Sequence, residues 1–436
     1  MSKYEIKVVR NERPSPLPAD ETKLGFGRVF TDHMFVMEWD KNVGWHDAAI
    51  VPFGPLTIHP ASTVLHYGAE IFEGLKAYRW ADGSVKMFRP EENFKRMNRS
   101  AERMGLPQFD GDFMLAALKE LVALDRDWVP HGEGTSLYIR PFMIGDDEHL
   151  GVHGVAHARF HIILSPSGSY YATGLAPVKI MIEAHDVRAV RGGTGEAKCG
   201  GNYAASVRAG ERAAEKGFSQ VLWLDGVEQK YIEEVGAMNI MFKIAGKIVT
   251  PALTGSILPG ITRKSIIELL RHRGIEVEER RISVDELAAA LEAGKLEEAW
   301  GCGTAAVVSP IGQLTYREKD YIISGTVVTP KLTGSILPGI TRKSCIELLR
   351  EMGYTVEERL LSADELEKAL HSGALQEAWG CGTAAVISPI GELRMNGVSM
   401  TVADGGIGKL SQKLYDTLTS IQWGIAPDPH GWTCRV

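Results

Sequence analysis

The stretch GTGEAKCGGNYAAS, residues 193–206, places Lys198 among glycines, and a predicted helix (residues 205–217) and strand (residues 220–226) follow it. Glycines allow a backbone to approach a ligand closely. The stretch is not a P-loop, because Ala197 precedes the lysine and no Ser or Thr follows it, and it lacks the spacing of a dinucleotide fingerprint. A lysine in such a loop is most often a solvated surface residue, so a chemical role needs support from other motifs.

A second motif supplies that support. LTGSILPGITRKS occurs at residues 253–265 and again, unchanged, at residues 332–344. A helix predicted to begin at Ile261 and Thr262 offers free N–H groups to a phosphate. The glycine-flanked threonine loop GCGT, residues 301–304, follows. A lysine nucleophile near an anion site suggests a Schiff base with pyridoxal phosphate.

The repeated motif belongs to a tandem repeat with a period of 79 residues, whose copies are residues 246–324 (copy one) and 325–403 (copy two). Between residues 249–314 and 328–393, 17 of the 66 aligned positions differ. Most differences fall where a helix or loop would face water, which argues against a verbatim copying artefact. Two copies of this length are not a solenoid, so we expect one domain with an extra segment.

Each copy is predicted to contain a loop, a helix, a second helix and a strand. In copy one the first helix starts after Gly260 and stops at Gly274, and Ser283 with Glu286 has the spacing of a capping box before the second. The final predicted helix, residues 408–424, occurs once.

One site needs only one copy, so two arrangements are open. In the first, copy one continues from the hairpin NIMFKIAGKIVTP, residues 239–251, and fills the site while copy two lies outside. In the second, copy two fills the site and copy one bulges out near Gly246. The tight hairpin favours the first arrangement. In either case the spare copy would expose apolar faces, and we expect reduced solubility or a mispaired dimer.

Composition excludes several classes of protein. The 436 residues are 44% hydrophobic, which suits about two domains with ample core. The net charge of −7 and the absence of a basic run predict no nucleic-acid partner. No apolar stretch is long enough for a signal peptide or a membrane span, which predicts a cytoplasmic protein. The five cysteines form no C-x-x-C pair, so neither a disulfide framework nor a zinc or other metal site is expected.

Predicted strands and helices alternate in the first half, for example the strand at residues 157–168 and the helix at residues 92–105, which is a mixed α+β or α/β pattern. A stretch rich in Pro, Gly, Ser and Tyr interrupts it. We therefore predict a small N-terminal domain (residues 1–168), a linker (residues 169–177) and a large domain (residues 178–436).

Together these motifs resemble one enzyme family. The stretches FTDHMFVMEWD, LHYGAEIFEGLKAYR, SLYIRPFMIG, GTGEAKCGGNYAAS, QVLWLDG, EEVGAMNI, TGSILPGITR and GCGTAAV occur in the order and at nearly the spacing found in branched-chain amino-acid aminotransferases. That family consists of two-domain, fold-type IV enzymes that depend on pyridoxal 5'-phosphate. The resemblance covers the whole chain except one repeat copy, and it implies a homodimer.

The resemblance also implies roles for individual residues. Lys198 matches the lysine that binds the cofactor covalently and shuttles the substrate proton, and Glu234 matches the carboxylate that faces the ring nitrogen. Tyr203 matches the partner of the phenolate oxygen. The matching phosphate ligands are Arg96, Ile261, Thr262 and Thr304. Next to these residues, Glu233, Arg99 and Arg103 are interpreted as solvated surface charges.

The substrate pocket follows from the same resemblance. The matching aromatic walls are Phe26, Tyr67, Phe72, Tyr138 and Tyr170. Thr304 and Ala305 match positions that hold the substrate carboxylate, and Arg140 matches a position near the pocket. The implied reaction moves the amino group of L-leucine, L-isoleucine or L-valine to 2-oxoglutarate in two half-reactions. An apolar pocket does not single out one of the three, because a methylene is worth only ~1 to 3 kcal/mol.

Other interpretations remain open at this point. D-amino-acid aminotransferase and aminodeoxychorismate lyase share the Lys and Glu scheme but generally lack the long N-terminal block and the SLYIRPF stretch. A catalytically silent protein, disrupted by the duplication, is the alternative from another class. The residues that complete the site are either Ile261, Thr262 and Thr304 or their copy-two equivalents Ile340, Thr341 and Thr383.

Overall fold

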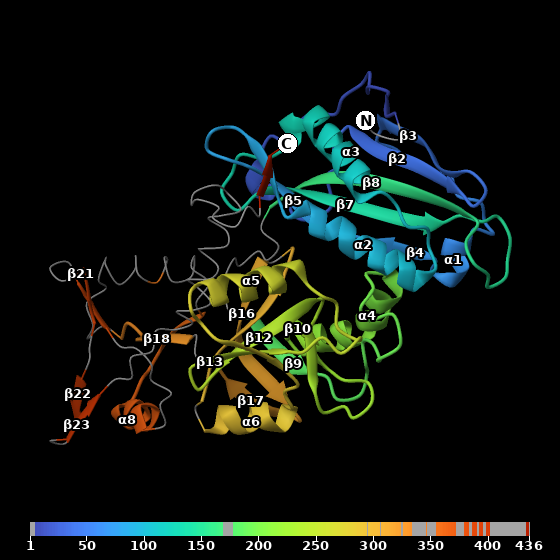
Figure 1. Ribbon diagram of the computed structural model, residues 1–436. Coiled ribbons are helices and arrows are strands. Elements are labelled where there is room, and N and C mark those ends of the chain that lie inside the picture. The colour runs from blue at the N-terminus through green and yellow to red at the C-terminus, as the bar shows by residue number, and fades with distance from the viewer. Residues whose placement is uncertain are drawn as a thin grey trace.

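The chain folds around two nine-stranded sheets that lie one above the other in Figure 1. This computed structural model describes residues 5–168, 178–293, 295–305, 307–323, 326–333, 346, 355–371, 379–382, 386–389, 392–395, 398–401 and 433–435. The predicted linker and the predicted final helix lie outside these residues.

The first sheet has the order β1-β3-β2-β8-β7-β5-β6-β24, with β4 paired to β7. Its strands are β1 (Lys7–Val8), β2 (His33–Asp40), β3 (Gly44–Pro52), β4 (Glu70–Phe72), β5 (Leu75–Arg79), β6 (Val85–Phe88), β7 (Ser136–Gly145), β8 (His157–Ser167) and β24 (Thr433–Arg435). The predicted strand at residues 157–168 is confirmed as β8, which pairs with β7 along most of its length. The carboxyl end of the chain reaches this sheet through β24, beside β6.

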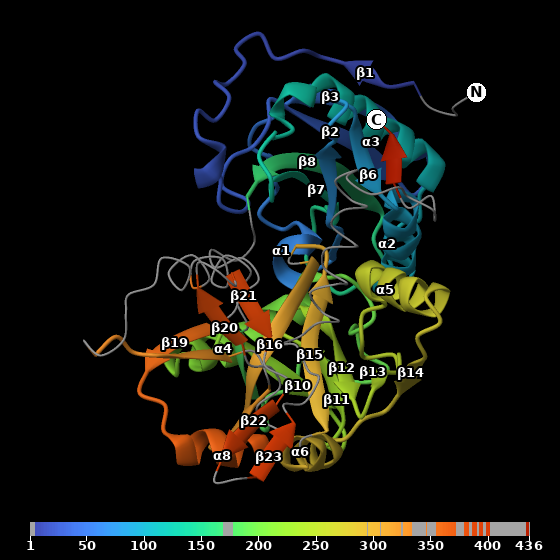
Figure 2. The ribbon, with the colours of Figure 1, turned by 90° about the vertical axis from the view of Figure 1, so that its left-hand side faces the viewer.

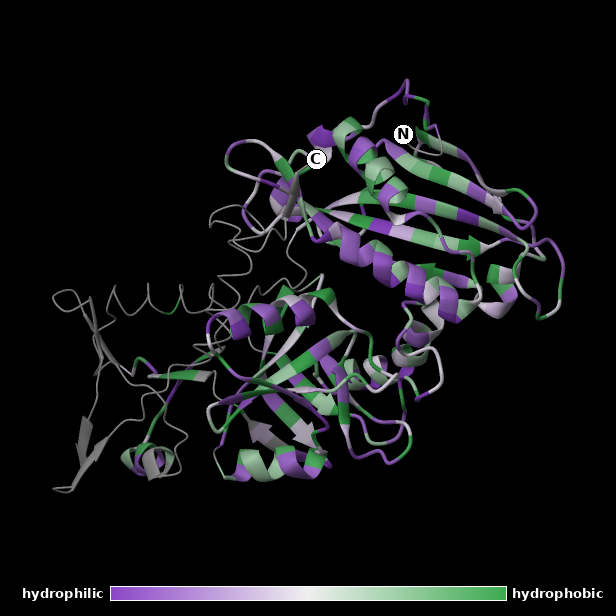
Figure 3. Cartoon of the chain, viewed as in Figure 1, coloured by the Kyte–Doolittle hydropathy of each residue, from purple (hydrophilic) through white to green (hydrophobic). Residues whose placement is uncertain are grey.

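Two helices cover the first sheet, α2 (Pro90–Met104) and α3 (Gly111–Leu124). The shorter helical elements are α1 (Thr63–Tyr67), η1 (Glu21–Lys23) and η2 (Arg126–Trp128). α2 confirms the helix predicted at residues 92–105. Its buried face carries Phe94, Met97 and Ala101, spaced by three and four residues as one side of a helix requires. In Figure 3 the strands are rich in hydrophobic residues, whereas α2 shows mostly hydrophilic ones.

The second sheet has the order β11-β10-β9-β16-β15-β12-β13-β14, with β17 paired to β16. Its strands are β9 (Val178–Ile182), β10 (Gln220–Leu224), β11 (Ile232–Val235), β12 (Met238–Ile244), β13 (Lys247–Pro251), β14 (Val277–Arg280), β15 (Leu296–Gly303), β16 (Val307–Tyr316) and β17 (Lys319–Ile322). Its helices are α4 (Gly200–Glu215), α5 (Ile261–His272) and α6 (Val284–Glu292). Parallel pairs, such as β9 with β10, occur beside antiparallel ones, so the mixed α/β class is confirmed.

The hairpin between β12 and β13 leads directly into copy one. Its two turn residues, Ala245 and Gly246, have φ values of 48° and 80°. Two consecutive positive φ values are typical of the tight two-residue turns that connect antiparallel strands. The predicted hairpin is therefore confirmed, and copy one supplies β13 to β17 of the second sheet.

Most helix boundaries agree with the sequence signals. α5 begins after Gly260, as predicted, and Gly274 follows it with a φ of 73°. The Oγ of Ser283 accepts a hydrogen bond of 3.0 Å from the Glu286 amide, but the Glu286 carboxylate pairs with Arg280, so only half of the capping box forms. α4 starts at Gly200, earlier than predicted. The sequence prediction missed its first turn because that turn contains glycines, which have low helix propensity.

In Figure 1 the described elements of copy two, in orange and red, lie to one side of the second sheet, and in Figure 2 they lie in front of it. Its elements are β18 (Thr326–Pro330), β19 (Thr355–Arg359), α8 (Ala363–His371), β20 (Trp379–Gly382), β21 (Val386–Pro389), β22 (Glu392–Met395) and β23 (Val398–Thr401). As far as these residues are described, its strands form only two-stranded sheets among themselves. The structure thus adopts the first of the two predicted arrangements.

Exposed apolar side chains mark the described part of copy two. Leu360 is 73% exposed, and its equivalent in copy one is Arg281. Leu361 is only partly buried, whereas its equivalent in copy one, Ile282, is fully buried against the second sheet.

None of the helices in the described part of the chain combines the length and the apolar character that crossing a membrane requires.

Candidate active site

A cavity of about 240 Å³ is lined by residues from both sheets, from helices α2, α4 and α5, and from loops. It brings together most of the residues that the sequence predicted for the site. These are Phe26, Phe72, Arg96, Tyr138, Arg140, Lys198, Tyr203, Glu234, Ile261, Thr262, Thr304 and Ala305. Tyr67 does not line the cavity, and Tyr170 lies outside the described residues.

Lys198 immediately precedes the first turn of α4 and is held by the first half of the chain. Its amide donates to the Ser100 hydroxyl at 2.9 Å, and its carbonyl accepts from the Phe72 amide at 2.9 Å. The side-chain Nζ donates to the Tyr203 hydroxyl at 2.6 Å. Burial, aided by the nearby Arg96 cation, lowers the pKa of Lys198 to about 8. A neutral amine is therefore far more accessible here than for an ordinary lysine.

Tyr203 stands one turn into α4, beside the Phe72 ring at a centroid distance of 4.9 Å. Burial, together with the nearby Glu234, raises the pKa of Tyr203 to about 12. The phenol therefore keeps its proton near neutral pH and can donate a hydrogen bond into the cavity.

Glu234 lies on β11 and is only 3% exposed. The Arg188 guanidinium contacts one carboxylate oxygen at 2.7 Å, and the Asn239 amide donates to the other at 3.0 Å. Burial raises the pKa of Glu234, while Arg188 opposes that rise. Sequence reasoning missed Arg188, because its contact with Glu234 spans 46 positions of the chain and no short motif encodes it.

The prediction that Glu233 is a solvated neighbour is wrong. Its side chain is buried at 5% exposure, and it accepts a hydrogen bond from the Ser256 hydroxyl. The reason is that all four residues of β11 are buried, so both faces of this strand are covered. On such a strand, adjacent side chains point to opposite faces and neither reaches water.

Arg96, on α2, is buried and paired with a carboxylate that the sequence did not reveal. Its Nε and Nη2 donate to Glu73 at 2.7 and 2.8 Å, and its Nη1 donates to the Pro259 carbonyl at 3.2 Å. Burial alone would raise the pKa of Glu73, but Arg96 holds it below the usual value. Arg99 and Arg103 are exposed, as predicted, and the Arg103 Nε donates to the Gly193 carbonyl at 3.0 Å.

The start of α5 forms one end of the cavity. Its N-cap, Gly260, has no capping side chain, which leaves the first N–H groups, those of Ile261 and Thr262, available to an anion. A Cβ on Gly260 would lie 1.9 Å from Asn239 Oδ1, so only glycine fits there. Ile261 and Thr262, which line the cavity, both belong to copy one.

The GCGT loop of copy one reaches the cavity at Thr304 and Ala305. The Lys76 Nζ donates to the Ala305 carbonyl at 2.8 Å and ties this loop to β5 of the first sheet. The copy-two counterparts of these cavity residues, Ile340, Thr341 and Thr383, lie outside the described residues.

Aromatic side chains form the wall on the side of the first sheet. Phe26 meets Tyr138 edge to face, with ring centroids 4.7 Å apart. The Arg140 guanidinium lies 4.7 Å from the Phe72 ring centroid and donates to the Tyr138 hydroxyl at 3.0 Å. Tyr67 instead lies at the surface, 41% exposed, where its hydroxyl accepts from the Gly151 amide at 2.7 Å.

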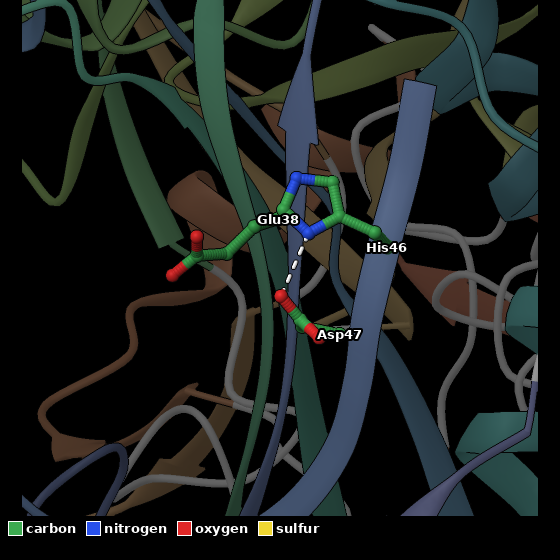
Figure 4. Close-up of side chains that lie close together, drawn as sticks. All are labelled: Glu38, His46 and Asp47. Carbon is green, nitrogen blue, oxygen red and sulfur yellow. Dashed lines mark hydrogen bonds and ion pairs between the residues drawn. The ribbon is translucent and has the colours of Figure 1, made fainter. Parts of the chain in front are cut away.

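One group of side chains elsewhere has the composition of a metal site. Ligand atoms of Glu38, His46 and Asp47 lie within 4.8 Å of one another, and His46 Nδ1 lies 2.8 Å from Asp47 Oδ2 (Figure 4). The two carboxylates are exposed, and none of the three residues lines the cavity. Exposed groups of this kind are common without a metal, so the group has no assigned role.

Comparison with known proteins agrees with this geometry. The family model Amino-transferase class IV matches residues 70–314 and 321–393. Branched-chain-amino-acid aminotransferase 2 of Bacillus subtilis (strain 168) is 52% identical over 364 residues, covering 83% of this chain and 99% of the relative. Branched-chain-amino-acid transaminase 1 of the same organism is 45% identical over 433 residues, covering 99% of this chain and 98% of the relative.

A solved structure shares the fold. The branched-chain amino acid aminotransferase from Escherichia coli aligns with a TM-score of 0.57 at 21% identity, covering 92% of this chain and 98% of that one. Family model and relatives span most of the sequence, the first sheet and the second included. The chain belongs to the class IV aminotransferase family.

Proposed function

We propose that this protein is a branched-chain-amino-acid transaminase, which moves the amino group of L-leucine, L-isoleucine or L-valine to 2-oxoglutarate with pyridoxal 5'-phosphate as cofactor. The observation that carries the proposal is the Lys198 amine, 2.6 Å from the Tyr203 hydroxyl in a cavity that also contains Glu234 and the start of α5. Relatives covered almost completely by this chain bear the names of such enzymes.

The residues of the cavity fit the chemical groups of the cofactor. The uncapped start of α5, whose N-cap tolerates no Cβ, and the guanidinium of Arg96 suit a phosphate. Ile261 and Thr262 provide backbone N–H groups, and Thr304 lies on the cavity wall. Glu234 would face the ring nitrogen and Tyr203 the phenolate oxygen. When bound, pyridoxal phosphate supplies an electron sink for the carbanion formed at the substrate Cα.

Lys198 both binds the cofactor and moves the proton. With a pKa lowered to about 8, its amine is neutral often enough to react as a nucleophile near neutral pH. The same amine can take the proton from the substrate Cα, because a general base works best when its pKa is near the operating pH. Tyr203, which stays protonated, orients the amine through the 2.6 Å hydrogen bond.

The aromatic wall would select the substrate side chain. Phe26, Phe72 and Tyr138 offer apolar surface to a branched side chain. Thr304 and Ala305 would hold the substrate carboxylate, and Arg140, hydrogen-bonded to Tyr138, adds a positive charge to the wall.

The proposal extends to the assembly and its location. Residues 1–168 and 178–436 would be two domains joined by residues 169–177, and the protein would act as a homodimer in the cytoplasm. Exposed Tyr67 supports the dimer, because a family-matched pocket residue that misses its own cavity can serve the partner's. The partners are then small molecules and a second copy of the chain.

The test is to add pyridoxal phosphate to the cofactor-free protein and reduce with borohydride. We expect a visible absorption band and a covalent label on Lys198, both absent in Lys198→Ala. The rate of labelling should rise with pH and level off above about 8, whereas an ordinary lysine would continue to gain up to about 10.5. Equal spectra for wild type and Lys198→Ala would refute the proposal.

A substrate assay separates the enzyme classes. L-leucine with 2-oxoglutarate should give glutamate, and D-alanine should not. Activity with D-alanine would indicate a D-amino-acid aminotransferase instead. A labelled protein without activity toward either would be the catalytically silent homologue.

A further inference from the structure

Arg188 lies where three segments of the active site meet, and it is 9% exposed. Its Nη2 donates to the Ser256 carbonyl at 2.6 Å and to the Gly195 carbonyl at 3.4 Å, and it contacts Glu234 at 2.7 Å. Gly195 belongs to the loop before Lys198, and Ser256 belongs to LTGSILPGITRKS. The Arg188 guanidinium thus connects the loop before Lys198 and the stretch LTGSILPGITRKS to the Glu234 carboxylate.

The close approach of the two motifs is built into the sequence. A Cβ on Gly195 would lie 2.3 Å from the Ser256 carbonyl oxygen, so the position requires glycine. This approach puts both carbonyl oxygens within reach of Arg188. One nitrogen of the guanidinium, Nη2, is therefore held against the two backbone carbonyls and against the Glu234 carboxylate.

Charged groups from several segments of the chain surround Glu234. Arg188 is the nearest cation, Lys198 is a second cation and Glu233, on the same strand, is a like charge, while Tyr203 faces it as a phenol. Burial raises the pKa of Glu233 as well as that of Glu234. Around Glu233 stand the Ser256 hydroxyl, Arg188, Asp225 and Arg281.

We propose that Arg188 is a positioning residue that keeps Glu234 ionised, so that the proton shared between Glu234 and the cofactor's ring nitrogen stays on the nitrogen. The proposal rests on the proposed function, which puts the ring nitrogen opposite Glu234. A buried carboxylate takes up a proton unless a cation pairs with it. Arginine suits this role because it stays charged even when buried.

The balance of charges supports the same conclusion. With the nitrogen protonated, the ionised Glu234 lies between two positive charges, those of Arg188 and of the ring. Without Arg188 the buried Glu234 carboxylate would face the ring with no arginine paired to it. The proton would then move from the nitrogen to Glu234, which leaves a neutral acid and a neutral ring.

The experiment uses the holoenzyme with pyridoxal phosphate labelled with ¹⁵N in the ring, and reads the ¹⁵N chemical shift at neutral pH. We expect the value of a protonated ring nitrogen in the wild type. In Arg188→Met and Arg188→Gln it should move toward the value of an unprotonated ring. Arg188→Gln keeps an amide donor for Ser256 and Glu234, so it separates the loss of charge from the loss of hydrogen bonds.

Three control variants test whether the charge of Arg188 determines the protonation of the ring nitrogen. Arg188→Lys, which retains the charge, should keep the nitrogen mostly protonated. Arg191→Met, at an exposed neighbour in the same loop, should match the wild type. Glu233→Gln removes a like charge beside Glu234, so its effect on the proton should be opposite to that of Arg188→Gln.

Two failures are distinguishable. If borohydride fixes no cofactor onto Lys198 in the wild type, the proposed function is wrong. If the cofactor binds at Lys198 and the nitrogen of Arg188→Gln stays as protonated as in the wild type, this role of Arg188 is refuted. The same holds if Glu233→Gln deprotonates the nitrogen.

Discussion

The two repeat copies carry nearly the same sequence in different surroundings. In copy one, β15 and β16 pair with Trp300 opposite Pro310, and in copy two, β20 and β21 pair with Trp379 opposite Pro389. These pairs are the same positions of the repeat. The parallel pair β13 and β14 likewise recurs as β18 and β19, with Ile248 opposite Val277 in the first copy and Val327 opposite Val356 in the second.

What differs is the contact with the rest of the chain. β15 also pairs with β12, and β16 also pairs with β9, and both partner strands lie outside the repeat. Each partner occurs once, so only one copy can occupy the second sheet. Local sequence therefore determines the register within each pair, whereas placement in the sheet, and with it the active site, depends on partners that are not duplicated.

The largest effect should follow from deleting residues 325–403. The exposed Leu360 of copy two, where copy one has Arg281, and the partly buried Leu361 provide apolar surface for association. In sedimentation velocity we expect the full chain to associate with rising concentration and the deletion variant to form one species. Leu360→Arg, which restores the Arg281 of copy one, should reduce the association in part. Identical sedimentation and melting temperature for full chain and deletion variant would contradict this expectation.

Equivalent leucines in the two second helices should respond differently to truncation. Leu287 of α6 is fully buried, whereas Leu366 of α8 is only partly buried. We expect Leu287→Ala to lower the free energy of unfolding by ~2 to 5 kcal/mol, the range for a buried leucine. For Leu366→Ala we expect less than ~1 kcal/mol, because few contacts are lost. Urea denaturation measures both, and equal losses would mean that copy two is packed as copy one is.

A smaller effect should be shared by both copies. Ser283 caps α6 with a hydrogen bond of 3.0 Å, and Ser362 caps α8 with one of 3.1 Å. Replacing either serine by alanine should cost ~1 kcal/mol of local helix stability. Amide hydrogen exchange should show a similar loss of protection in each helix, while only Ser283→Ala shifts the main unfolding transition. A main transition that moves equally with Ser362→Ala would show that α8 unfolds together with the second sheet.

Much of this architecture was predictable because its signals are local. The limits of α5 depend on Gly260 and Gly274, the cap of α6 depends on Ser283, and the turn after β12 depends on Gly246. Each acts through residues within a few positions of itself. Lys198 and Glu234 were likewise found from short motifs that resemble those of one family.

The parts that were missed depend on distant contacts. Glu73 pairs with Arg96 across 23 positions, and Arg188 reaches Glu234 from a different segment of the second half. Glu233 was misjudged because nothing in its neighbourhood reveals that β11 is covered on both faces. Tyr67 belongs to a matching motif, yet whether it lines its own cavity depends on how α1 packs, and the structure puts it at the surface.

The central claim is that copy one completes the cofactor site, and paired proline substitutions test it most directly. Thr262→Pro removes one N–H from the first turn of α5, where that N–H has no partner within the helix, and Thr341→Pro makes the same change in copy two. A hydrogen bond to a charged group is worth ~1.5 to 3 kcal/mol, so the dissociation constant of pyridoxal phosphate should rise at least ~10-fold in Thr262→Pro. It should be unchanged in Thr341→Pro. Weaker binding in Thr341→Pro, with Thr262→Pro as the wild type, would show that copy two forms the site.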